Sequence, residues 1–169
     1  MPWQKTSFKQ SSFKSCYDFL ILDKMNFRYK LNKRSFEDNH KTPSIPISIK
    51  GNSNTNFEFI ALLDSGADFS VIPQDVAELL NLDLTKKKEK VRGIGGWLDS
   101  IEEKITITVS KGHEIYSFTI PVKVILGEED KIGDIPIILG RNGFFNKFKI
   151  TFDQANERVS LKWNSERKY

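Results

Sequence analysis

Ala61-Leu62-Leu63-Asp64-Ser65-Gly66-Ala67-Asp68 is the stretch around which the rest of the chain is organised. The apolar run from Phe59 to Leu63 predicts a buried strand that ends in a carboxylate, a hydroxyl and a glycine. A carboxylate at the end of such a strand is partly desolvated, so it must be hydrogen-bonded, paired or used in chemistry. A plain exit from strand to turn is the alternative, because Asp and Gly are ordinary turn formers.

Two later segments favour a functional site over a simple turn. Gly93-Ile94-Gly95-Gly96-Trp97 lies about thirty residues on, and Ile137-Ile138-Leu139-Gly140-Arg141-Asn142 lies about forty-five beyond it. The three segments, in this order, resemble the retropepsin family, the homodimeric aspartic proteases known best from retroviruses. The resemblance covers roughly Pro43 to Trp163. It implies a mainly β fold, a closed antiparallel β barrel with one or two short helices, active as a symmetric homodimer.

The resemblance implies a role for each residue of the first segment. Asp64 polarises the attacking water and then protonates the leaving amine of the substrate. Ser65 hydrogen-bonds across the dimer interface, and Gly66 admits the substrate backbone beside the catalytic pair. Ala67 and Asp68 meet the flanking main chain of the substrate.

The third segment is expected to support the first. In the family, the residue that matches Arg141 forms an ion pair with the residue that matches Asp68. We therefore expect an Asp68–Arg141 ion pair beside Gly140, with the chain from Gly140 to Phe145 turning into a short helix.

The glycine-rich segment predicts the tip of a hairpin whose arms are residues 89–93 and 97–101, which we call the flap hairpin. A tight turn alone would explain some of the glycines. Three glycines within four residues, Gly93, Gly95 and Gly96, exceed what a two-residue turn needs, since each adds backbone entropy that folding must overcome. We therefore expect a mobile flap over an extended peptide, and the resemblance implies that the N–H of Ile94 holds a water or a substrate carbonyl.

The number of Asp-Ser-Gly motifs predicts the assembly. An aspartic protease needs two adjacent carboxylates, one ionised to take a proton from water and one protonated to bind the scissile carbonyl. This chain has one such motif, since Asp99 and Asp134 stand in other contexts. A two-fold homodimer places Asp64 beside its symmetry mate. Two carboxylates at such short distance are expected to share one proton.

Hydrophobic alternation predicts the remaining elements. Ile45, Ile47 and Ile49 alternate with other residues, and a turn at 51–54 leads back into a strand over 57–63. Further strands are expected over 69–72, 105–109, 116–124, 135–139, 149–152 and 158–163, a helix over 73–80, an acidic loop over 126–133 and a strand over 26–31.

Composition limits the remaining possibilities. A chain of 169 residues suits one domain, which we place at 42–169 after an N-terminal arm over 1–41, with Met25 as an alternative start. With 28% charged residues and no apolar run near twenty residues, we expect a soluble, cytoplasmic protein with no membrane partner. Cys16 is the single cysteine, and His40 and His113 are isolated, so we expect neither metal nor cofactor.

The charge pattern does not favour nucleic-acid binding. The net charge of +4 is mild, and the run from Lys86 to Lys90 suits a solvated turn better than a nucleic-acid site, because no aromatic residue interleaves it. Three functions are compatible with these patterns. The first is an aspartic endopeptidase acting on a peptide or protein. A non-catalytic module that holds an extended peptide by strand addition is the alternative, and a dimerisation domain with a dormant site is the third.

Overall fold

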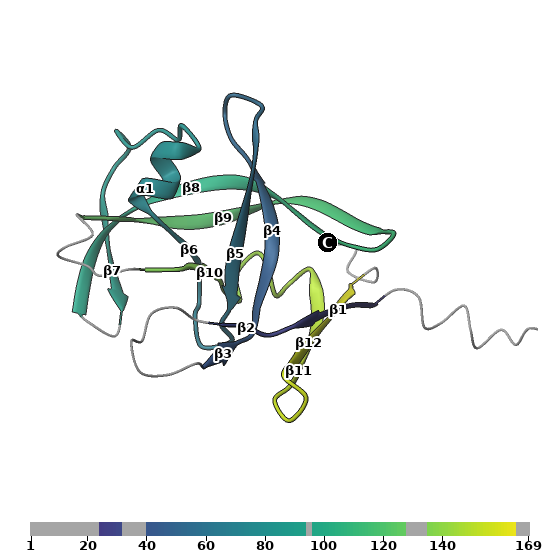
Figure 1. Ribbon diagram of the computed structural model, residues 1–169. Helices are drawn as coiled ribbons and strands as arrows, with labels where there is room; N and C mark the ends of the chain where they lie inside the picture. Colours follow the sequence, from purple (N-terminus) through teal and green to yellow (C-terminus); the bar gives the residue numbers. More distant parts are fainter. Residues whose placement is uncertain (1–23, 32–39, 94–95, 128–134, 165–169) are drawn as a thin grey trace, which may run out of the picture.

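The computed structural model describes residues 24–31, 40–93, 96–127 and 135–164, which form twelve strands and one short helix (Figure 1). The strands are β1 (Lys24–Arg28), β2 (Lys30–Leu31), β3 (Lys41–Thr42), β4 (Ser44–Lys50), β5 (Asn56–Leu63), β6 (Ser70–Pro73), β7 (Glu89–Gly93), β8 (Gly96–Lys111), β9 (Glu114–Leu126), β10 (Ile137–Leu139), β11 (Phe148–Asp153) and β12 (Arg158–Trp163), and the helix is α1 (Gln74–Leu79).

Six strands close into a barrel in the order β4-β5-β10-β6-β9-β8, because β8 also pairs with β4. The closed, mainly β barrel expected from the sequence is confirmed. Pairing is antiparallel except that β10 runs parallel to β5 and β6 runs parallel to β9. The expectation of an antiparallel barrel is therefore wrong at these two junctions. Neither parallel pair is joined by a hairpin, so long connections allow the parallel direction.

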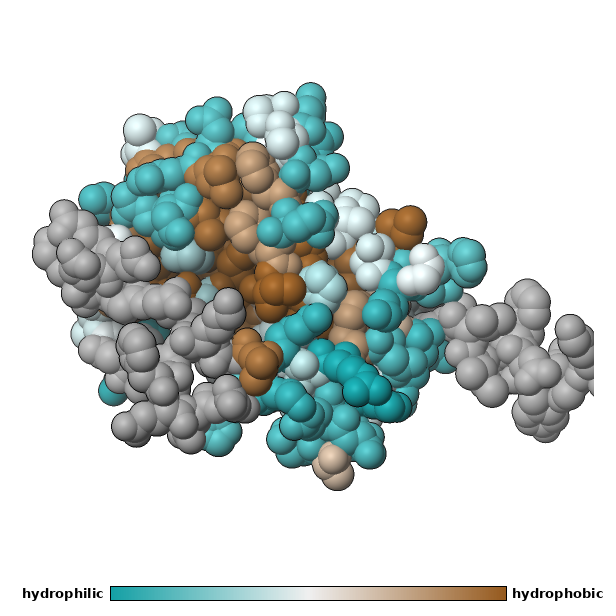
Figure 2. Space-filling view, viewed as in Figure 1, coloured by the Kyte–Doolittle hydropathy of each residue, from teal (hydrophilic) through white to brown (hydrophobic). Residues whose placement is uncertain are grey.

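The β4–β5 hairpin confirms the alternation read from the sequence. Ile45, Ile47 and Ile49 on β4 are all buried in the core. On β5 the predicted continuous buried run is wrong, because Ile60 leaves 52% of its surface exposed while Ala61 is buried. Successive side chains of a strand point to opposite faces, and the outer face of β5 is not covered at Ile60. Figure 2 shows hydrophobic residues gathered over the upper and central part of this view.

Strand β8 runs without interruption through residues that the sequence assigns to two separate strands. The join contains Glu103, which takes a core-facing position and is only 8% exposed. The Nζ of Lys86 lies 2.6 Å from its Oε1, which neutralises the buried carboxylate. A charged residue that finds a partner therefore does not end the strand.

The predicted short helix after Gly140 is wrong, and those residues form turns instead. The backbone N–H groups of Arg141 and Asn142 donate to carbonyls of Ala67 and Asp68 rather than to carbonyls of their own segment. Gly143 has a φ of +94°, outside the helical range. The one described helix, α1, lies within the range 73–80 expected for it. None of the described helices is long and apolar enough to cross a membrane.

A second sheet, in the order β1-β12-β11, contains residues from the segment assigned to the N-terminal arm. Met25 and Phe27 of β1 are buried, as is Tyr29 just beyond it. Strand β1 pairs with β12 from Lys24–Lys162 to Arg28–Arg158. Residues 24–31 are thus packed against the rest of the chain, while the boundary at residue 41 and a start at Met25 stay predictions.

Aromatic side chains fix the second sheet to the barrel. Phe118 of β9 lies 5.6 Å from the ring of Phe148 on β11 and 5.5 Å from Trp163 on β12. Phe144, in the turn before β11, is fully buried and 5.2 Å from Phe148. Such ring contacts add to area burial. They hold the turn that follows β10 in place.

Candidate functional site

Asp64 stands where two neighbouring parallel strands end. Leu63 closes β5 directly opposite Leu139, the last residue of β10. The backbone N–H of Asp64 donates to the Leu139 carbonyl at 3.1 Å. The N–H of Gly66 then donates to Oδ1 of Asp64 at 2.8 Å, so the half-buried carboxylate is hydrogen-bonded by its own loop. This contact fixes the orientation of the carboxylate within the loop.

The loop after Asp64 is tied to the turn after β10. The N–H of Arg141 donates to the carbonyl of Ala67 at 2.9 Å, and that of Asn142 donates to Asp68 at 2.8 Å. The predicted Asp68–Arg141 ion pair is confirmed, with Nη2 of Arg141 on Oδ1 of Asp68. Both side chains are about 60% exposed, at 63% and 61%. Exposed ion pairs add little stability, so the two backbone bonds are the stronger tie.

Arg141→Gln tests whether the two backbone hydrogen bonds contribute more than the Asp68–Arg141 ion pair. We expect the free energy of unfolding to fall by less than about 1 kcal/mol, since the variant loses an exposed ion pair and keeps both backbone bonds. Urea denaturation measures the change, and Arg92→Gln, which removes an exposed arginine from β7, is the matched control. A loss above about 3 kcal/mol would show that the ion pair itself holds the loop.

Gly140 lies against the backbone of the same loop. A Cβ at this position would sit 2.3 Å from the carbonyl oxygen of Phe69 and 2.9 Å from that of Ala67. Its N–H donates to the buried Oγ of Ser70 at 3.1 Å. No sequence signal assigns Ser70 to the site, because only the fold brings it to Gly140. Glycine is therefore required here by the close approach of two backbone segments.

The loop leaves one face of the molecule open. Ser65, Gly66 and Asp68 are exposed, and Phe69 leaves 41% of its surface exposed. The half-buried carboxylate of Asp64 thus lies beside residues that solvent, a substrate or a second chain can reach.

The flap hairpin is confirmed as β7 and the first part of β8. Among the described strands, β7 pairs only with β8, so the hairpin extends the barrel at one edge. Gly93 lies opposite Gly96, whose φ of +116° strongly favours glycine. Ile94 and Gly95, assigned to substrate binding, lie outside the described residues. Trp97 beside them is 67% exposed.

A buried lysine supports the base of the flap hairpin. Nζ of Lys123 on β9 lies 2.7 Å from Glu89 on β7 and 2.8 Å from Glu102 on β8. The same ammonium lies 5.7 Å from the ring centre of Phe69, next to Asp68. Burial lowers the pKa of Lys123, but hydrogen bonds to the two carboxylates outweigh it and the pKa is raised. Lys123 was not among the residues expected at the site, although a lysine between Val122 and Val124 is a visible signal in the sequence.

Lys123, Glu89 and Glu102 form a cluster in which only the lysine is buried, and this difference in burial gives a prediction. The lysine side chain is 10% exposed, while Glu89 and Glu102 are 49% and 60% exposed. Lys123→Met leaves two carboxylates in water, whereas Glu89→Gln with Glu102→Gln leaves a buried ammonium without a counter-charge. We expect the free energy of unfolding, measured by urea denaturation, to fall further in the double glutamine variant than in Lys123→Met. A larger loss in Lys123→Met would contradict this account.

The same cluster predicts a pH effect. The hydrogen bond from Lys123 holds the pKa of Glu89 below its ordinary value of 4.5. Between the folded pKa of Glu89 and its ordinary value, the unfolded chain binds more protons than the folded chain. The stabilisation is therefore present above pH 4.5 and is lost as the pH falls through the folded pKa. Between about pH 5 and 3, wild-type stability should fall more steeply than that of Lys123→Met. Parallel curves would contradict the prediction.

The sequence pattern of a known family covers this site. The family described as "Retroviral aspartyl protease" matches residues 39–151, well over half of the chain and including Asp64, the flap hairpin and Arg141. The chain belongs to the retroviral aspartyl protease family. Membership supports an aspartic protease function in general terms. No curated protein matches the sequence.

Two solved protease structures are also similar to the chain. A retropepsin-like aspartic protease from Rickettsia conorii has 19% sequence identity and a TM-score of 0.53, covering 82% of this chain and 98% of that one. At this identity the likeness shows the shared fold. The protease of EIAV, solved with the inhibitor HBY-793, has 26% identity and a TM-score of 0.36, covering 63% of this chain and 88% of that one.

Proposed function

We propose that this protein is a homodimeric aspartic endopeptidase in which the Asp64 carboxylates of two subunits activate one water for attack on a peptide bond. The observation that carries the proposal is the placement of Asp64. Its half-buried carboxylate is held by the Gly66 N–H at the end of β5, on an open face, in a chain of the retroviral aspartyl protease family.

The second carboxylate comes from the second subunit. The sequence contains a single Asp-Ser-Gly motif, and an isologous interface brings the same residue of both subunits together. One Asp64 carboxylate is ionised and accepts a proton from the water, while the other is protonated and donates a hydrogen bond to the scissile carbonyl. The accepted proton then passes to the leaving amine, which completes hydrolysis.

Neighbouring residues of the loop serve the dimer and the substrate. The exposed hydroxyl of Ser65 hydrogen-bonds across the interface, and Gly66 lets the substrate backbone approach. Ala67 and Asp68 contact the substrate main chain. Gly140 and Arg141 keep this loop in position through the close backbone approach and the bond from the Arg141 N–H to Ala67.

The flap hairpin closes over the bound peptide. Gly93 and Gly96 flank its tip, where Ile94 and Gly95 offer backbone N–H groups to the substrate. An extended peptide between the flap and the Asp64 loop presents its carbonyls to donors on both sides, which is the logic of strand addition. Closure also excludes water, which strengthens the electrostatics of the carboxylate pair.

Hydrolysis of a mixed peptide library between about pH 3 and 7 tests the proposal, because a shared-proton carboxylate pair works in this range. The full chain is used, with sedimentation to establish that it is dimeric and a statine-type transition-state mimic as inhibitor. We expect cleavage that peaks in acid and is blocked by the mimic. A dimeric protein that binds the peptides without cleaving them would contradict the proposal and favour the non-catalytic peptide-binding function.

A further inference from the structure

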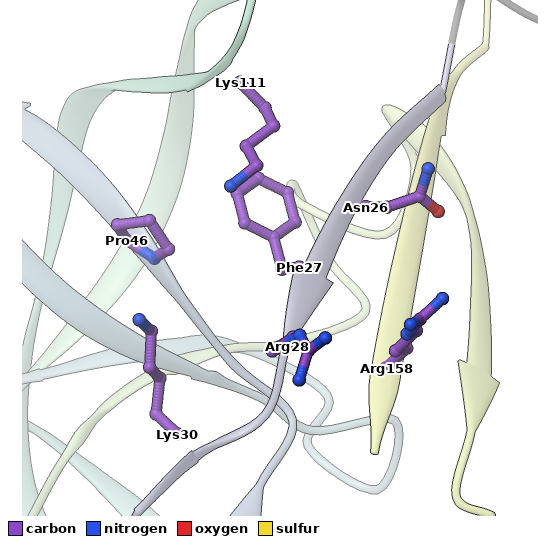
Figure 3. Close-up of a pocket in the computed structure, with 7 residues that line it drawn as sticks. All are labelled: Asn26, Phe27, Arg28, Lys30, Pro46, Lys111 and Arg158. Carbon is purple, nitrogen blue, oxygen red and sulfur yellow. The ribbon is translucent and has the colours of Figure 1, made fainter. Parts of the chain in front are cut away.

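A cavity of about 380 Å³ lies away from the Asp64 loop, where β1 faces β4 and the end of β8 (Figure 3). Its lining residues, which define what we call the basic pocket, are Asn26, Phe27, Arg28, Lys30, Pro46, Lys111 and Arg158. Four of these seven side chains are cationic, and none of the described lining residues is acidic. The proposed peptidase chemistry uses none of them.

The four cations of the basic pocket are not neutralised within the described part of the chain, where none of them forms an ion pair. Arg28 stands directly opposite Arg158 in the β1–β12 register. Like charges directly opposite each other on antiparallel strands are destabilising. The Nζ of Lys111 lies 5.6 Å over the ring of Phe27, a contact weaker than a buried ion pair.

The carboxylates near the basic pocket form no ion pair with its cations within the described residues, although hydrogen bonds from Asn156 and, to a smaller degree, the charge of Arg158 lower the pKa of Asp153. The pocket therefore concentrates positive charge, and Figure 3 shows Lys30 and Lys111 reaching into it from opposite sides. Asp153, opposite Arg158, accepts from Asn156 Nδ2 at 2.9 Å; Glu157 pairs with Lys41; and Glu114, opposite Lys111, accepts from the Tyr116 hydroxyl at 2.6 Å.

This arrangement suits phosphate groups better than a single carboxylate. A phosphate carries up to two charges and three strong acceptor oxygens. Arginine forks bind phosphate oxygens bidentately, and Arg28 and Arg158 present two such forks from neighbouring strands. Two further ammonium groups, those of Lys30 and Lys111, complement a second phosphate. A volume of 380 Å³ falls at the lower end of the range for small-molecule sites.

A nucleic-acid strand fits the basic pocket less well. Proteins that bind single strands offer exposed aromatic faces on which bases stack. The one aromatic residue that lines the pocket, Phe27, is only 3% exposed and lies beneath the ammonium of Lys111. A compact group of cations without a stacking surface favours a small anion over a polymer.

The geometry points to a binding site in the basic pocket for a small ligand with two adjacent phosphate groups. Arg28 and Arg158 hold one phosphate between β1 and β12, which converts their mutual repulsion into shared attraction. Lys30 and Lys111 hold the other phosphate against β4 and β8. The ligand thereby stabilises the attachment of β1 to the rest of the fold.

Inorganic pyrophosphate is the probe that tests this site. Calorimetric titration and thermal unfolding of the full chain are run in sodium chloride at matched ionic strength. We expect pyrophosphate to raise the melting temperature of the wild type, and Arg28→Gln and Arg158→Gln each to weaken its binding about tenfold or more. Without pyrophosphate Arg28→Gln should melt at or above the wild-type temperature, because it removes the like-charge contact with Arg158.

The controls separate a built site from general anion binding. Arg92→Gln removes the same charge from β7, which does not line the basic pocket, and should keep the wild-type affinity. Equal binding by Arg28→Gln, Arg158→Gln and the wild type would overturn the inference, as would equal stabilisation by sulfate. Tighter binding of a short single-stranded oligonucleotide than of pyrophosphate would overturn it in favour of nucleic acid. Because no readout uses peptide cleavage, the result is independent of the proposed peptidase function.

Discussion

Asp64→Asn is expected to lower the rate of peptide cleavage by about 10⁴-fold or more while leaving the fold and the dimer intact. An amide cannot accept a proton from the attacking water, and a pair of amides cannot share a proton. In the wild type the Gly66 N–H donates to Oδ1 of Asp64 at 2.8 Å. The fold should survive because Oδ1 of the asparagine can accept the same hydrogen bond. Single-turnover peptide hydrolysis, thermal unfolding and sedimentation measure these three properties.

Asp75→Asn is the matched control for this loss. It makes the same chemical change at an exposed residue in the first turn of α1, outside the proposed machinery, and should keep the wild-type rate. Turnover retained by Asp64→Asn would contradict the proposed mechanism. A melting temperature lowered in Asp64→Asn but not in Asp75→Asn would show that the carboxylate is also structural, and the rate would then be compared at a temperature where both variants are folded.

The sequence predicts the parts of the site that are local in the chain. Asp64 at the end of an apolar strand and the flap hairpin are readable from short segments, and the structure contains both. The Asp68–Arg141 pair joins positions 73 residues apart and was expected only from the family resemblance. The bond from Gly140 to Ser70 joins positions 70 residues apart, so no local pattern reveals it. Lys123 shows a detectable but weaker signal, a charge inside an apolar strand.

The fold follows the same division. Alternating burial predicts β4, and turn residues predict the hairpins, because both depend on neighbouring residues. The direction of β10 between β5 and β6 depends on packing across the barrel, and the sequence expectation of antiparallel pairing was wrong there. The segment after Gly140 is helix-compatible by composition, yet the carbonyls of Ala67 and Asp68 compete for its N–H groups. Tertiary hydrogen bonds outweigh weak local propensity.

Gly140→Ala is expected to destabilise the fold strongly. The new Cβ would lie 2.3 Å from the carbonyl oxygen of Phe69 and 2.5 Å from its carbonyl carbon. Both are backbone atoms of the segment that follows Asp64, so no side chain can move aside. We expect a loss of about 3 kcal/mol in the free energy of unfolding and a fall of about 6–12 °C in Tm, measured by urea and thermal denaturation.

The clash also separates stability from activity. Relief of the contact requires the backbone near Phe69 to move away from Gly140, and the hydrogen bond from Arg141 to Ala67 moves with it. Cleavage should therefore fall in Gly140→Ala even at temperatures where the variant is folded, because the Asp64 loop shifts. Gly93→Ala is the control for stability, since its Cβ would meet only the Leu98 side chain at 3.8 Å, an ordinary contact. If Gly140→Ala proves as stable as Gly93→Ala, the two backbone segments do not pack as closely as described, and the support assigned to Gly140 fails.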